Sequence, residues 1–127
     1  EPGEYSFDDL IRDKQTVWDG VTNALALKHL RAIRKGDELL IYHTGNVRAA
    51  VGIGKAASDP YPDPTKQDPK IVVVDVVPVR RLAQPATLEA IKASPVFHSF
   101  ELVRLPRLSV MPVPTMLWKK ILQMSER

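Results

Sequence analysis

The chain of 127 residues contains no cysteine and no long apolar run. The absence of cysteine excludes disulfide bonds, cysteine-based zinc sites and thiol nucleophiles, and it fits a cytoplasmic protein. A membrane span needs about 20 consecutive apolar residues, so no membrane partner is expected. The length predicts a single domain, residues 1–127, that buries roughly two-thirds of the surface of the unfolded chain.

Motifs of catalysis are equally scarce. The three histidines are His29, His43 and His98, and nothing in the sequence brings two of them together. Metal-binding spacings such as HExxH and HxH are absent, so neither a metal nor a cofactor is predicted. The segment VGIGKAAS at 51–58 lacks the GxxxxGK[ST] spacing of a phosphate-binding loop. We therefore expect a protein that binds a ligand and is not an enzyme.

Charge is unevenly distributed along the chain, whose net charge is +3. Residues 1–75 carry 10 Lys or Arg and 12 Asp or Glu, a balance of −2. Residues 76–127 carry 8 Lys or Arg and 3 Asp or Glu, a balance of +5. A basic second part is typical of a phosphate-facing surface, although an ordinary solvated surface has the same composition.

Four helices are predicted from capping residues and apolar spacing, at residues 6–14, 22–35, 87–94 and 114–124. Ser6 and Thr87 stand where N-caps belong, and Thr22 or Asn23 caps the second helix. The side chains predicted to face inward from the first and last helices are Leu10, Ile11, Met116, Leu117, Ile121 and Leu122.

Three strands are predicted, at residues 37–43, 47–58 and 71–79. Both alternating faces of the first strand are apolar, which predicts a central strand covered on two sides. Gly52 and Gly54 share one face of the second strand, which indicates a bend or the close approach of another group. Short strands are possible around 102–103 and 108–110 within an irregular segment. These elements predict an α+β fold around a small mixed barrel.

Polar and aromatic residues gather in two segments, VWDGVTN at 17–23 and LLIYHTGN at 39–46. Trp18, Asn23, Tyr42 and His43 from these segments are predicted to converge on a planar heterocycle. An indole stacks on a base with about 1–3 kcal/mol, and an amide offers a donor and an acceptor to the base edge. The alternative interpretation is a buried Trp18 and a Tyr42 hydroxyl bonded to the backbone.

Five segments in order along the chain resemble the EVE domain family. They are EPGEYSFDDL at 1–10, WDGVTNALALKHLRAIRKGDELLIYHTG at 18–45, VGIGKAASDPYPDP at 51–64, VVVDVVPVRRL at 72–82 and RLSVMPVP at 107–114. The resemblance implies a PUA-like fold, a small curved sheet or barrel flanked by helices. It also implies a reader of modified bases in DNA or RNA, because EVE domains are similar to YTH domains, which hold a methylated adenine in an aromatic cage.

The resemblance carries over position by position. The family's WDGVRN motif is matched except at Thr22, which replaces its Arg, and small or apolar Ala24, Leu25 and Leu27 replace larger polar or aromatic family residues. The binding pocket that the resemblance implies comprises Trp18, Asn23, Tyr42, His43, Thr44 and Ser109. The weaker candidates for phosphate contacts are Lys28, Arg80, Arg81 and Arg107.

Three functions remain open at this stage. A reader of modified nucleic acid would bind more weakly as salt rises. A sensor of a free nucleoside or metabolite would use the same pocket without that salt dependence. An enzyme acting on a modified base would need a general base such as His43 beside the substrate.

Overall fold

The computed structural model describes residues 6–43, 48–105 and 109–126. The helices of this part are α1 (Phe7–Asp13), α2 (Ala24–Arg31), α3 (Leu88–Ala93), the 3-10 helix η1 (Pro95–Phe97), α4 (Glu101–Arg104) and α5 (Thr115–Ser125). Its strands are β1 (Thr16–Trp18), β2 (Glu38–His43), β3 (Ala49–Ala56), β4 (Tyr61–Pro62) and β5 (Val72–Thr87). Thr44, Arg107 and part of the strand considered at 108–110 lie outside the described residues.

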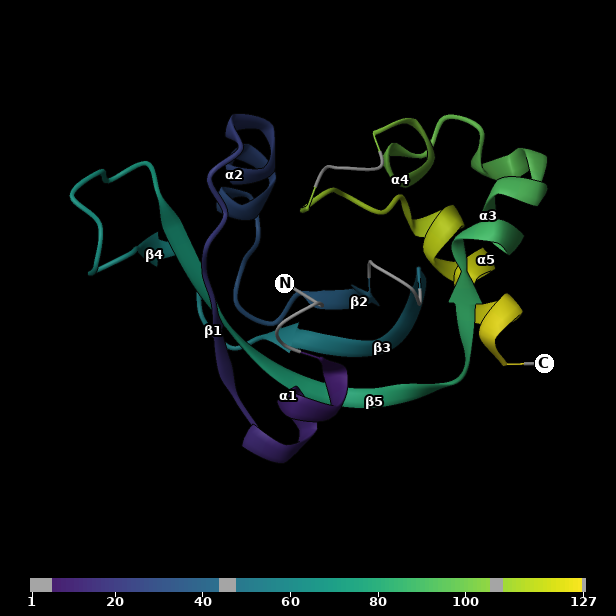
Figure 1. Ribbon diagram of the computed structural model, residues 1–127, viewed down its shortest axis with the longest axis horizontal. Helices are drawn as coiled ribbons and strands as arrows, with labels where there is room; N and C mark the ends of the chain where they lie inside the picture. The colour runs from purple at the N-terminus through teal and green to yellow at the C-terminus, as the bar shows by residue number, and fades with distance from the viewer. Residues whose placement is uncertain (1–5, 44–47, 106–108, 127) are drawn as a thin grey trace.

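A curved antiparallel sheet organises the molecule. Its strand order is β1-β5-β3-β2, and β4 pairs with β5 outside this path. Two register shifts interrupt the pairing of β3 with β5, one between Ala50 and Gly52 and one between Ile53 and Gly54. Such irregularities bend a strand and increase its twist. Figure 1 shows α1 below the curved strands, α2 above them, and α3, α4 and α5 grouped at the far end of β5. The predicted α+β fold with a curved sheet flanked by helices is confirmed.

Two separate hydrophobic cores cover different parts of this sheet. The first core is formed mainly by α1, α2 and the beginning of β5, and includes Phe7, Leu10, Leu27, Leu30 and Val74. The second core is formed mainly by α3, η1, α4, α5 and β3, and includes Ile53, Ile91, Phe97, Phe100 and Ile121. The fold therefore places a boundary between two packed regions across one sheet.

Strand β2 lies at this boundary, which corrects its predicted place in the sheet. It ends the strand path instead of lying in the middle. Its faces are nevertheless both covered, because Leu39 and Ile41 pack against the first core while Leu40 and Tyr42 pack against the second. Within the described residues, an apolar pattern on two faces is therefore satisfied by two cores and not by a second neighbouring strand.

The predicted helix caps are confirmed. The side chains of Ser6, Asn23 and Thr87 accept hydrogen bonds from the third backbone N–H of α1, α2 and α3, at 3.1, 3.0 and 3.1 Å. The carboxylate of Asp9 accepts a hydrogen bond from the Ser6 N–H and completes a capping box. These contacts involve neighbours in sequence, which is why residue type alone predicts them.

Several element boundaries and orientations were predicted wrongly. Helix α2 ends at Arg31 and not at residue 35, because the N–H groups of Ala32 and Ile33 donate to the carbonyls of His29 and Leu30, three residues back, and the α-helical pattern stops. Ile11 and Met116 are 42% and 67% exposed and do not face inward. The range 102–103 is helical within α4, and β5 runs eight residues past the predicted end at 79. Strands β1 and β4 were missed because three and two residues are too short for an alternating pattern.

A cleft between the two cores

A cleft of about 900 Å³ opens along the boundary between the two cores. One side is formed by β1, the turn after it and the end of α2, and the other side by residues 109–113 and α5. Strand β2 contributes residues from both of its faces. The segment before α5 crosses the space between α2 and α5 in Figure 1. This volume lies in the range typical of small-molecule sites, about 300–1,000 Å³.

Beside the buried ring of Phe100, three aromatic side chains from different elements line this cleft. Trp18 ends β1, pairs in register with Val74 of β5, and packs against the first core. Tyr42 of β2 and Trp118 of α5 pack against the second core. All three are partly buried, so each ring is anchored in a core and still borders the cleft. Trp18 is therefore both packed against a core and part of the cleft wall, the two interpretations that the sequence left open.

The hydroxyl of Tyr42 is held in its neutral form. Burial raises the pKa of Tyr42 above its ordinary value, and the nearby charge of Arg48 lowers it by a smaller amount. A neutral phenol both donates and accepts a hydrogen bond, so the Tyr42 hydroxyl can act as donor or as acceptor toward a ligand in the cleft.

The structure brings only part of the predicted pocket together. Trp18, Tyr42 and Ser109 line the cleft. Asn23 and His43 do not: the Asn23 side chain caps α2, and His43 Nε2 accepts the backbone N–H of Phe7 at 3.0 Å. Both side chains therefore bond to backbone N–H groups of helices, Asn23 in its own helix α2 and His43 in the first turn of α1.

Three of the four proposed phosphate contacts, the described residues Lys28, Arg80 and Arg81, lie away from the cleft lining. Lys28 is exposed on α2. The guanidinium of Arg80 lies 3.5 Å from the carboxylate of Glu126, and that of Arg81 pairs with Asp8 and lies 5.6 Å from the centre of the Phe7 ring. Exposed ion pairs of this kind contribute about 0–1 kcal/mol, so both arginines could exchange their carboxylate for a phosphate at little cost.

Sequence reasoning missed several polar or aromatic members of the cleft, among them His29 and Trp118. Trp118 stands three and four residues before Ile121 and Leu122, which were predicted to face inward. Helical spacing would therefore have placed the indole on the same side of α5. His29 gave no comparable signal, because it was a single histidine on a helix whose apolar stripe was already assigned.

The bond between His43 and Phe7 predicts a stability that depends on pH. Burial is the largest influence and lowers the pKa of His43 from its ordinary 6.5, Asp8 opposes this, and Arg81 lowers the pKa further. The unfolded chain therefore binds the proton more tightly than the folded chain. We expect the free energy of unfolding to be highest above pH 6.5 and to decrease as the pH falls through the lowered pKa.

Thermal unfolding measured between about pH 5 and pH 8 checks this expectation. The variant His43→Gln is the control, because its side-chain oxygen can accept the Phe7 N–H but does not titrate. Its midpoint temperature should vary less over this range than that of the wild type. An identical pH profile for both proteins would show that His43 is not responsible.

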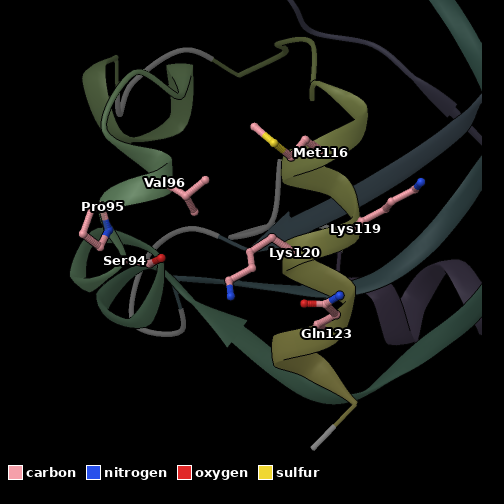
Figure 2. Close-up of a pocket in the computed structure, with 7 residues that line it drawn as sticks. All are labelled: Ser94, Pro95, Val96, Met116, Lys119, Lys120 and Gln123. Atoms are coloured by element: carbon pink, nitrogen blue, oxygen red, sulfur yellow. The ribbon is translucent and has the colours of Figure 1, made fainter.

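A second, smaller hollow of about 460 Å³ lies on the outer side of α5. Its lining comprises Ser94, Pro95, Val96, Met116, Lys119, Lys120 and Gln123. Figure 2 shows Lys120 extending from α5 toward the side of Ser94, whereas Lys119 points away across the other side of the helix. None of these residues is aromatic, so this hollow offers no ring on which a base could stack.

The described residues contain no group of three or more His, Cys, Asp or Glu side chains placed to hold a metal ion. Nor does any helix within them combine the length and hydrophobicity needed to cross a membrane.

Comparison with known proteins identifies the family. The model of the EVE domain matches residues 1–124, so the chain belongs to the EVE domain family. Thymocyte nuclear protein 1 from Mus musculus is 32% identical over 148 residues, and the match covers 97% of this chain and 66% of that protein. The chain thus spans slightly less than two-thirds of that relative.

Solved structures show the same fold. Rpa0253 from Rhodopseudomonas palustris, determined by NMR, is 36% identical with a TM-score of 0.92, covering 98% of this chain and 88% of that one. The crystal structure of human THYN1 in complex with DNA containing 5-methylcytosine is 28% identical with a TM-score of 0.87. That match covers 97% of this chain and 86% of the human one.

Proposed function

We propose that the chain acts as one EVE domain over residues 1–127 that binds nucleic acid without catalysis and recognises a modified base in the cleft. The observation that carries this proposal is the cleft of about 900 Å³ bordered by Trp18, Tyr42 and Trp118. It is supported by the human relative, whose crystal structure contains DNA with 5-methylcytosine. DNA bearing this base is therefore the first ligand to test.

The aromatic lining suits a base that has left the helical stack. Extruding a nucleotide costs a few kcal/mol, and stacking on an aromatic side chain contributes about 1–3 kcal/mol per base. Trp18 and Trp118 are anchored in different cores, so a base between them can contact both sides of the cleft. Tyr42 and Ser109 supply hydroxyl groups for the polar edge of the base.

The position of His43 favours binding over catalysis. An enzyme acting on a base in the cleft would need a proton acceptor within hydrogen-bond reach of that base. His43, the residue considered for that role, does not line the cleft and accepts the N–H of Phe7. Its imidazole therefore helps to hold the first turn of α1 against the end of β2.

The described candidates for phosphate contacts, Lys28, Arg80 and Arg81, lie outside the lining of the cleft. The charged side chains that line it in the described residues are those of Asp19, Asp37 and Glu38, which repel phosphate. Lys28, Arg80, Arg81 and Arg107 remain the proposed contacts to the sugar-phosphate backbone. They would set affinity and its salt dependence, whereas the cleft would set selectivity.

Fluorescence anisotropy with labelled single-stranded DNA tests the proposal. The probes carry one central 5-methylcytosine or one cytosine and are titrated at about 50 mM and 200 mM salt. We expect tighter binding of the methylated probe at both concentrations and weaker binding of both probes at the higher one. Binding of free 5-methylcytidine that matches the oligonucleotide and does not change with salt would support a small-molecule sensor instead. Absence of binding to any of these probes would contradict the proposal.

A further inference from the structure

His29 carries an unusual polar atom in the wall of the cleft. It lies near the C-terminal end of α2, and its imidazole is among the groups that line the cleft. Its Nε2 is shielded from solvent and has no hydrogen-bond partner in the part of the chain that the structure describes. No other buried side-chain nitrogen or oxygen of the described residues lacks a partner.

An unpartnered buried polar atom is costly and therefore informative. Burying a donor or acceptor without a partner costs about 1–3 kcal/mol, and the large majority of buried polar side-chain atoms are bonded. At His29 this cost falls inside a ligand-sized cleft. A ligand that supplies the missing partner would recover it.

The chemistry of the cleft favours an Nε2 that accepts a hydrogen bond. In a neutral imidazole one nitrogen carries the N–H and the other a lone pair, so an Nε2 without the proton presents a lone pair to a ligand. The charged groups lining the cleft in the described residues are the carboxylates of Asp19, Asp37 and Glu38. Their negative charge favours ligand groups that donate hydrogen bonds over ligand oxygens.

We propose that Nε2 of His29 accepts a hydrogen bond from the exocyclic amino group of the bound base. This inference rests on the proposed function and narrows it to bases that carry an amino group, such as derivatives of cytosine and adenine. A base reaches Nε2 when the imidazole turns about its Cβ–Cγ bond, whose torsional preference is broad, or when a neighbouring side chain moves.

Thymine and 5-methylcytosine form a matched pair of probes for this proposal. Both carry the methyl group on C5, but cytosine presents an amino donor at position 4 where thymine presents a carbonyl acceptor. Single-stranded probes that differ only at this base avoid any difference in base pairing. We expect the wild type to bind the 5-methylcytosine probe roughly three- to tenfold more tightly, the effect of one hydrogen bond.

The variant His29→Leu should lose this preference by weakening the binding of the 5-methylcytosine probe to the level of the thymine probe. His98→Leu is the matched control, because His98 is exposed, lies outside the cleft lining, and undergoes the same chemical change. That variant should keep the wild-type preference. A preference that survives in His29→Leu would overturn the role of His29.

A measurement on the wild type covers the case in which His29→Leu does not fold. The imidazole ¹⁵N resonances of His29 should show Nε2 unprotonated and shifted on addition of the 5-methylcytosine probe. Equal binding of both probes, a preference for thymine, or an Nε2 that carries the proton overturns the proposed acceptor while the proposed function stands. Failure of the wild type to bind either probe contradicts the proposed function itself.

Discussion

Replacing Trp18 with alanine is expected to weaken the binding of single-stranded DNA containing 5-methylcytosine by roughly 5- to 150-fold. The loss corresponds to about 1–3 kcal/mol of stacking between a base and an aromatic ring. The Trp18 indole ends β1, packs against the first core on one side and borders the cleft on the other. Anisotropy titrations of the folded variant and the wild type at the same salt concentration measure the effect.

Two further variants separate stacking from a general loss of stability. Trp18→Phe keeps an aromatic ring and should retain more of the affinity than Trp18→Ala. Tyr61→Ala removes a partly buried aromatic residue outside the cleft lining, whose hydroxyl donates to Asp75 at 2.6 Å. It should lower the melting temperature without changing the dissociation constant at a temperature where it is folded. A Trp18→Ala protein that binds as tightly as the wild type would contradict stacking at this position.

Replacing Gly52 with alanine is expected to lower the free energy of unfolding by about 1–3 kcal/mol, the usual effect of overpacking a core. A Cβ atom at Gly52 would lie 2.6 Å from both Cε1 and Cε2 of Phe7. The Phe7 ring is 1% exposed, so it cannot swing into solvent without opening the first core. Urea denaturation of the variant and the wild type measures the difference.

A double-mutant cycle assigns this effect to the contact between glycine and ring. Phe7→Leu removes the ring atoms that a new methyl group would meet. In that background Gly52→Ala should cost less than it does alone, giving a coupling energy between the two positions. Equal costs in both backgrounds would show that the ring is not the obstacle.

Local features of this fold could be read from the sequence. Ser6, Asn23 and Thr87 cap their helices through neighbours three residues away, so residue type and position are sufficient. The close approach predicted at the strand glycines is also confirmed, by the Phe7 ring against Gly52.

Features that depend on distant contacts could not be read in the same way. The apolar pattern of β2 is compatible with a central strand or with an end strand between two cores, and only the tertiary packing decides. The backbone after α2 bonds to groups that are distant in sequence, the N–H of Lys35 to the Asp59 carboxylate and the N–H of Gly36 to the Ala56 carbonyl, instead of continuing the helix.

The same distinction between local features and distant contacts applies to the candidate site. Trp18 and Tyr42 were predicted because each stands in a short segment where polar and aromatic residues gather, in a chain with few aromatic residues. His43 was predicted to contact a ligand, but its Nε2 accepts a hydrogen bond from the N–H of Phe7. Phe7 is 36 residues away in sequence, so no local pattern could indicate this contact. The unpartnered nitrogen of His29 is likewise a property of the packed molecule and not of its sequence.

The two indole N–H resonances in a ¹H–¹⁵N spectrum test the central claim most directly. The chain has two tryptophans, Trp18 and Trp118, and both line the cleft. Addition of single-stranded DNA with one 5-methylcytosine should shift both signals in proportion to occupancy, and the unmethylated probe should shift them less at equal concentration. Binding of the methylated probe that leaves both signals unmoved would place the ligand elsewhere and contradict a base-binding cleft.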